Sequence, residues 1–211
     1  TASDAQRYIF SSEIFFRLVR PEEAAQLFPP DRTRIVLYLR DHLTYMMSWY
    51  AQAVQERNLI ASFADYVRVF SQPFMGFLRP WQQIYGANMV LRVFRREALF
   101  GQDSRRDFLQ FVDDVAPEDV IFPSEESNPT ISGNLLFFKR LLNNYMTYPE
   151  AYGYPMPDEF GAFAGVKPTF QGRFLADEDD VKAVRHVFKQ DILDMAAEGL
   201  DFGPMPDRIE G

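Results

Sequence analysis

Residues 33–54 read TRIVLYLRDHLTYMMSWYAQAV, and the spacing of apolar residues changes in the middle of this stretch. Residues 33–39 are mostly apolar and rich in β-branched side chains, which is typical of a strand covered on both faces. From Asp41 onward, apolar residues recur every three or four positions, as they do on one face of a helix. The members of this face are Leu43, Met46, Met47, Tyr50 and Val54. The stretch therefore predicts a buried strand that runs directly into an amphipathic helix.

Strand-like and helical patterns alternate along the rest of the chain. Short apolar runs predict strands at 7–12 and 88–94, and Ser62 is a candidate cap for one of the helices. The helical patterns lie at 20–28, 63–70, 79–85, 103–112, 131–146 and about 177–200. Such alternation predicts an α/β fold, with a parallel sheet flanked by helices on both faces. We assign residues 1–211 to one domain, in which 147–175 is a long loop rich in aromatic residues.

Composition and charge exclude several classes of protein. The chain has no run of 18 apolar residues, so no transmembrane segment is expected, and no secretory signal opens it. Its formal net charge of −8 argues against broad nucleic-acid binding, which needs a basic field. The absence of cysteine excludes thiolate metal sites and favours a reducing compartment, so we expect a cytoplasmic protein. The two histidines, His42 and His186, are too far apart in the sequence to suggest a metal site.

Arg40 and Ser48 are the candidate binding residues. In an open parallel sheet, ligands bind beyond the carboxyl ends of the strands, and Arg40 stands at that end of the predicted strand 33–39. Ser48 lies off the apolar face of the next helix, about 12 Å along its axis. A guanidinium fork and a hydroxyl together suit one phosphate group. The alternative is an arginine paired with a carboxylate and a serine with no function.

This pair resembles the 3′-phosphate-binding element of sulfotransferases that use 3′-phosphoadenosine-5′-phosphosulfate (PAPS). In that element a strand ends in Arg, and a Ser stands eight residues further on in the following helix. Three other segments resemble a bacterial-type sulfotransferase family in their order and spacing, so that the likeness covers about residues 7–115. They are YIFSSEIFF (8–16), RPWQQIYGANMVLRVFRREAL (79–99) and RRDFLQFV (105–112).

The resemblance implies a three-layer, P-loop-like parallel sheet and a PAPS-dependent enzyme that needs no metal. Its reaction would move a sulfuryl group from PAPS to a hydroxyl or amine of a carbohydrate or small-molecule acceptor. Arg40 and Ser48 would bind the 3′-phosphate. The sequence indicates neither the acceptor nor the oligomeric state, and it does not distinguish O-sulfation from N-sulfation.

One element of the family is missing. The family binds the 5′-phosphosulfate on a loop of the K-[ST]-G-[ST]-T kind after its first strand, whereas the first glycine here is Gly76. We therefore expect a partial chain that lacks this loop and the first strand of the sheet. Whether the chain as it stands is active is left open.

Glu13 is the candidate catalytic base. It follows two serines at the carboxyl end of the predicted strand 7–12, and the resemblance implies a base from this region. The alternative is a glutamate that stabilises a helix N-terminus. His42 is a second candidate, although a polar contact at the helix start is the expected role. Lys167 and Arg173, in the long loop, are candidates for a supporting role only.

Two other functions compete with the enzyme. One is a non-catalytic sulfotransferase-like remnant that acts as a binding module for a partner or polysaccharide. The other is a nucleotide-dependent kinase of the same broad fold, which is disfavoured because no Walker-type lysine or magnesium-binding acid pattern is visible.

Overall fold

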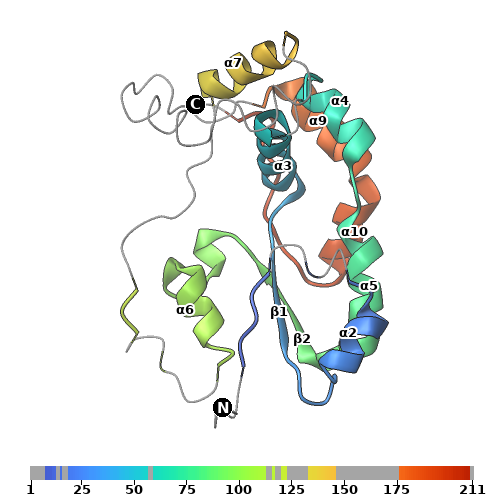
Figure 1. The fold of residues 1–211 in the computed structure, drawn as a ribbon, viewed down its shortest axis with the longest axis vertical. Coiled ribbons are helices and arrows are strands. Elements are labelled where there is room, and N and C mark those ends of the chain that lie inside the picture. The colour runs from blue at the N-terminus through green and yellow to red at the C-terminus, as the bar shows by residue number, and fades with distance from the viewer. Residues whose placement is uncertain are drawn as a thin grey trace. The chain divides into compact units, whose positions relative to one another are not determined.

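A computed structural model of the chain has a mixed α/β fold that is mostly helical, with a small two-stranded parallel sheet (Figure 1). The described residues are 8–12, 15, 19–56, 59–112, 116, 120–122, 133–145 and 176–209. The chain divides into two compact units, the first comprising Thr1–Leu37 and Pro73–Val90 and the second Tyr38–Gln72 and Leu91–Gly211. Strands β1 (Ile35–Leu39) and β2 (Met89–Val93) form the sheet, as the sequence predicts.

The first unit contains helices α2 (Pro21–Leu27) and α5 (Phe74–Tyr85), followed by the 3₁₀ turn η1 (Gly86–Asn88). Trp81 and Tyr85 are buried and stack with their ring centroids 5.6 Å apart. The Tyr85 hydroxyl donates a hydrogen bond to the carbonyl of Phe28, which joins the end of α5 to the end of α2. Trp81 and Tyr85 therefore connect α5 to the rest of this unit.

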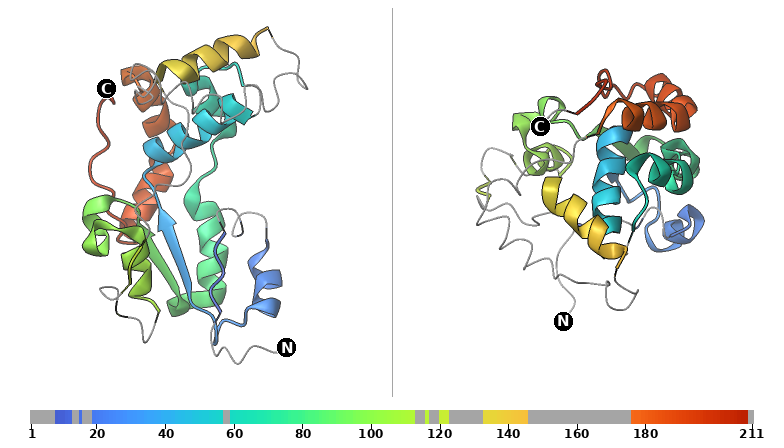
Figure 2. Two further views of the ribbon diagram at one scale, coloured as in Figure 1. Left: turned by 60° about the vertical axis from the view of Figure 1, so that its left-hand side comes forward. Right: turned by 90° about the horizontal axis from the view of Figure 1, so that it is seen from above.

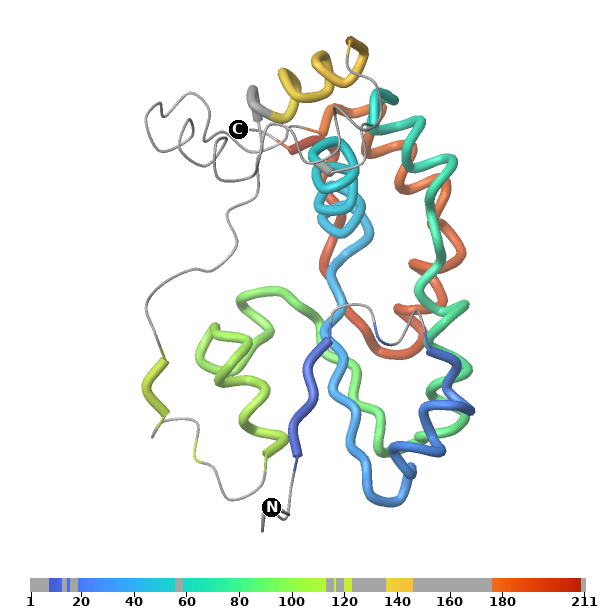
Figure 3. Tube along the Cα trace, viewed as in Figure 1, coloured from blue at the N-terminus to red at the C-terminus, as the bar shows by residue number. Residues whose placement is uncertain are grey.

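The second unit is built around α3 (His42–Glu56), which follows β1 after only two residues, Arg40 and Asp41 (Figure 3). Helix α3 packs against α4 (Phe63–Phe70), α7 (Gly133–Asn143) and α9 (Glu178–Val187), and the views in Figure 2 show α4 and α9 side by side. The buried face of α3 is largely the predicted one, with Leu43, Met46, Tyr50 and Val54 in the core.

Local side-chain contacts explain where the helices of this unit begin. The Asp41 carboxylate accepts a hydrogen bond from the Thr44 amide and caps α3. Ser62 caps α4 in the same way, as the sequence predicts, by accepting from the Asp65 amide. Asp177 forms a reciprocal capping box with Asp180 at the start of α9.

Three predictions of secondary structure were wrong in part. Residues 8–12 form neither strand nor helix. Tyr8, Ile9 and Phe10 are exposed, so this apolar run does not bury the side chains that would stabilise it as a strand. Strand β1 is mostly half-buried rather than covered on both faces. The helix expected at 177–200 is two helices, α9 and α10 (Lys189–Ala197), separated at Phe188.

Phe188 explains the break in that helix. Its backbone leaves the helical region, with φ −98° and ψ 11°, while its side chain is buried in the core formed by α3 and α9. Tertiary packing of one aromatic residue thus overrides a continuous helical pattern.

The remaining predictions about the fold have different outcomes. The three-layer arrangement stays a prediction, and the loop at 147–175 lies outside the described residues. Within the described ranges, no helix combines the length and apolar character needed to cross a bilayer.

We predict that Leu43→Ala lowers the free energy of unfolding by about 2–5 kcal/mol, because Leu43 is fully buried and its truncation leaves a cavity. Leu193→Ala is the matched control, since Leu193 is 56% exposed. Urea unfolding measures both variants. Equal losses would contradict the placement of the core on this face of α3.

Candidate functional site

Arg40 is exposed at the carboxyl end of β1, where the sequence places it. Its guanidinium carbon lies 4.9 Å from the centroid of the Phe94 ring. Phe94 follows β2, and its amide donates a 2.6 Å hydrogen bond to the carbonyl of Leu39. Among the described residues Arg40 forms no ion pair with a carboxylate, so the alternative of a paired arginine has no partner there.

Ser48 is exposed on α3, away from the buried face of that helix. In the part of the chain that the structure describes, no hydrogen bond joins Ser48 to Arg40. The two side chains belong to the same unit and to consecutive elements, but the structure does not itself link them.

The Asp41 carboxylate, next to Arg40 in the sequence, is hydrogen-bonded to the first turn of α3. It accepts hydrogen bonds from both the amide and the hydroxyl of Thr44. Because these donors belong to the first turn of the helix, the charge of Asp41 is directed toward the helix start. The nearest carboxylate in the sequence is therefore already hydrogen-bonded.

His42 is buried, with 2% of its surface exposed. Its Nε2 atom lies 2.7 Å from the carboxylate of Asp191 on α10, and its ring lies 4.6 Å from that of Phe188. Asp191 is also buried. These contacts fit the expected polar contact at the helix start and do not favour His42 as a catalytic base.

Glu13, the predicted base, lies outside the described residues, and so do Lys167 and Arg173. The nearest described contact is at Ser12, whose hydroxyl accepts a hydrogen bond from the Phe15 amide at 3.1 Å. The role of Glu13 stays a prediction. Within the described ranges, no three acidic or histidine side chains gather as a metal site would require.

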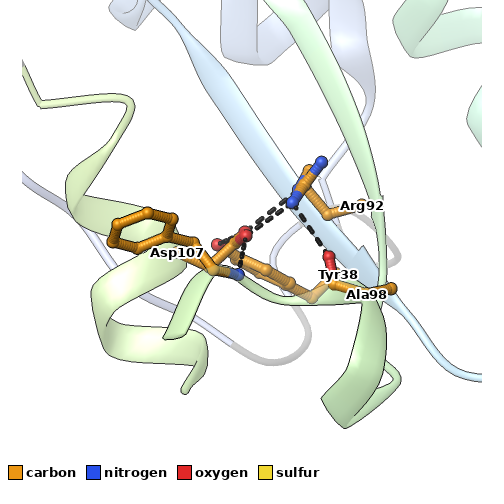
Figure 4. Close-up of polar contacts among 5 residues, drawn as sticks. Tyr38, Arg92, Ala98 and Asp107 are labelled. Carbon is orange, nitrogen blue, oxygen red and sulfur yellow. Dashed lines mark hydrogen bonds and ion pairs between the residues drawn. The ribbon is translucent and has the colours of Figure 1, made fainter. Parts of the chain in front are cut away.

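A buried carboxylate, Asp107, joins the ends of both strands to α6 (Ser104–Leu109), as Figure 4 shows. It accepts hydrogen bonds from the Tyr38 hydroxyl on β1 (2.9 Å), from Arg92 Nε on β2 (3.0 Å) and from the Phe100 amide (2.9 Å). A second guanidinium nitrogen of Arg92 also contacts Asp107 and donates to the carbonyl of Ala98.

The sequence analysis did not predict this network, although the sequence contains a pattern that indicates it. In the predicted helix 103–112, Asp107 precedes Phe111 by four positions, so a carboxylate shares a helix face with an aromatic residue. A carboxylate on an apolar face requires a cation or several donors. Arg92, on β2, is that cation.

The network determines the charge state of its members. Burial alone would raise the pKa of Asp107, but the hydrogen bonds from Arg92, the Phe100 amide and Tyr38 lower it overall. Burial, followed by the contact with Asp107, raises the pKa of Tyr38. At neutral pH an ionised Asp107 therefore faces a neutral phenol and a charged guanidinium, which makes a structural ion pair.

Comparison of the chain with protein-family models, with curated proteins and with solved structures finds no match. The assignment to a sulfotransferase family stays a prediction from the four sequence segments and from the placement of Arg40 and Ser48.

We predict that Asp107→Asn lowers the free energy of unfolding by about 3 kcal/mol, because it removes the buried anion that pairs with Arg92. Asp103→Asn is the control: that ion pair with Arg105 is more exposed, and asparagine still caps α6. Denaturant unfolding at neutral pH compares the two variants. Similar small losses would show that the network contributes little.

The same substitution should change the pH dependence of stability. Since folding lowers the pKa of Asp107, the folded state binds fewer protons there, and the stabilisation is complete above its ordinary pKa of 3.8. It is lost as the pH falls through the lower pKa of the folded state. Asp107→Asn should therefore lose less stability on acidification than the wild type, and an equal loss would contradict this assignment.

Proposed function

We propose that this chain belongs to a PAPS-dependent sulfotransferase, in which Arg40 and Ser48 hold the 3′-phosphate of the nucleotide. The observation that carries the proposal is an exposed arginine at the carboxyl end of a parallel strand, with no carboxylate partner among the described residues. Because the chain has a net charge of −8, one exposed arginine does not make it attract anions in general. We therefore infer that Arg40 binds one specific phosphate group.

The spacing of the two side chains supports a shared phosphate. Ser48 is eight residues after Arg40, roughly 12 Å at the helical rise per residue, and an extended arginine side chain covers much of that distance. The guanidinium supplies charge and two parallel N–H donors, and the hydroxyl supplies a third donor. The Asp41 carboxylate accepts hydrogen bonds from Thr44, and these donors partly offset its negative charge. Asp41 should therefore repel a phosphate at Arg40 less strongly.

The proposed reaction is a direct in-line transfer. An acceptor hydroxyl oxygen forms a bond to sulfur as the bond between sulfur and the 5′-phosphate oxygen breaks. Glu13 takes the proton of the acceptor, and adenosine 3′,5′-bisphosphate leaves with the electron pair. A carbohydrate or another small hydroxyl or amine compound is the proposed acceptor, and the three-layer P-loop-like sheet is the proposed scaffold.

One observation favours the second candidate, a binding module without catalysis. Residues 1–75 contain no glycine, and a phosphosulfate loop needs glycine because backbone N–H groups must approach the anion closely. By itself this chain would then retain the 3′-phosphate site without the group that activates the sulfate.

Binding of simple nucleotides tests the site. We predict that adenosine 3′-monophosphate and adenosine 3′,5′-bisphosphate bind to the chain and raise its melting temperature, whereas adenosine 5′-monophosphate does not. Arg40→Ala should weaken binding of the 3′-monophosphate at least about tenfold, because it removes a charge-assisted pair of hydrogen bonds. Ser48→Ala should weaken it by roughly threefold. Isothermal titration calorimetry measures these constants.

Arg68→Ala is the control for these variants, since Arg68 is an exposed arginine that pairs with Asp65 on α4. It should bind the 3′-monophosphate like the wild type. If the wild type binds none of the three nucleotides, or if Arg40→Ala binds as tightly as Arg68→Ala, the proposed cofactor is wrong.

Turnover tests the role of Glu13. If Glu13 is the base, Glu13→Gln should slow sulfuryl transfer from PAPS to a carbohydrate acceptor by about 100-fold or more, with unchanged affinity for adenosine 3′-monophosphate. Glu22→Gln, on the exposed first turn of α2, is the control. Unchanged turnover would exclude Glu13. Nucleotide binding without turnover in the wild type would favour the binding module.

A further inference from the structure

The Phe94 ring contacts aromatic and cationic side chains at once. The Arg40 guanidinium lies over it at 4.9 Å, and the Tyr38 ring meets it nearly perpendicularly, at 84°, with centroids 6.1 Å apart. Phe94 is also 37% exposed, so the rest of the protein covers its ring only in part. Its contacts suggest a role in holding Arg40.

We propose that Phe94 is a positioning residue that holds the Arg40 guanidinium with its N–H edge free for an anion. The inference rests on the proposed function, because it concerns the same arginine. A guanidinium presents its π-face to an aromatic ring, whereas all its N–H donors point outward in its own plane. A guanidinium that lies flat on Phe94 at this distance would be restrained without using the donors that a phosphate needs.

Restraint of the Arg40 side chain lowers the conformational entropy that is lost when it binds a ligand. A freely rotating arginine on the surface loses conformational entropy when it grips a ligand. An arginine that is already stacked has lost part of that freedom before the ligand arrives. A carboxylate partner would also restrain it, but would occupy its donors and cancel its charge.

The support extends from Phe94 into the buried network. The Phe94 amide is hydrogen-bonded to the carbonyl of Leu39, so the backbone at the ends of both strands is tied together. The Tyr38 ring that contacts Phe94 is itself held through its hydroxyl by Asp107. The order of support is thus Asp107, Tyr38, Phe94 and Arg40.

Affinity for adenosine 3′-monophosphate tests this role. Phe94→Leu should weaken binding about fivefold, as expected for the loss of one cation–π contact, and Phe94→Tyr should restore it. In the Arg40→Ala background, Phe94→Leu should have no further effect, because there is no guanidinium left to position. Phe70→Leu, at an exposed aromatic position on α4, is the control and should bind like the wild type.

A spectroscopic measurement tests the contact without any ligand. The Nε–H and Hδ resonances of Arg40 should be shifted upfield by the ring current of Phe94, and Phe94→Leu should remove that shift. Unshifted Arg40 resonances in the wild type would overturn the inference.

The outcomes separate this inference from the proposed function. If the wild type binds the nucleotide but Phe94→Leu binds it equally well, the positioning role is wrong and the proposed function stands. An additive loss in the double variant would also contradict positioning, because Phe94 would then act independently of Arg40. If the wild type binds no nucleotide, the proposed function fails and the positioning role falls with it.

Discussion

The buried carboxylate of Asp107 is the interaction on which the ends of both strands depend. It lies on α6 and binds Tyr38 of β1 and Arg92 of β2, which are far apart in the sequence. Arg40 and Phe94 each follow one of these anchors by two positions, and residues two apart in an extended chain point to the same side. The ion pair of the buried Asp107 with Arg92 therefore lies two positions before the exposed rim residue of one strand, and the Tyr38 contact lies two positions before that of the other.

Arg40 and His42 lie in different environments, although only one residue separates them in the sequence. Arg40 ends the strand and faces solvent, whereas His42 begins α3 and turns into the core, where it meets Asp191 and Phe188. Two basic residues separated by one position thus have different roles. Only the exposed one is available to a ligand from outside, and this is the physical basis for choosing Arg40 over His42 as a site residue.

The elements around the candidate site could be predicted from local sequence, but the long-range contacts between them could not. The period change near Asp41 predicted β1 and α3, and Ser62 predicted the start of α4, because periodicity and capping depend on neighbouring residues. The break at Phe188 and the pairing of Asp107 with Tyr38 depend on residues more than 60 positions apart. Periodicity and capping carry no information about such pairings. For the candidate site, the sequence predicted Arg40 and Ser48 but not Phe94. The contact between Arg40 and Phe94 joins residues that follow two different strands, so no local pattern indicates it.

A crystal structure of the chain bound to adenosine 3′-monophosphate would show both the Asp107 network and the phosphate site at Arg40 and Ser48. We expect a buried Asp107 between Tyr38 and Arg92, with the phosphate held by the N–H edge of Arg40 and by the Ser48 hydroxyl. A structure in which Asp107 faces solvent, or in which the phosphate binds away from Arg40, would contradict it.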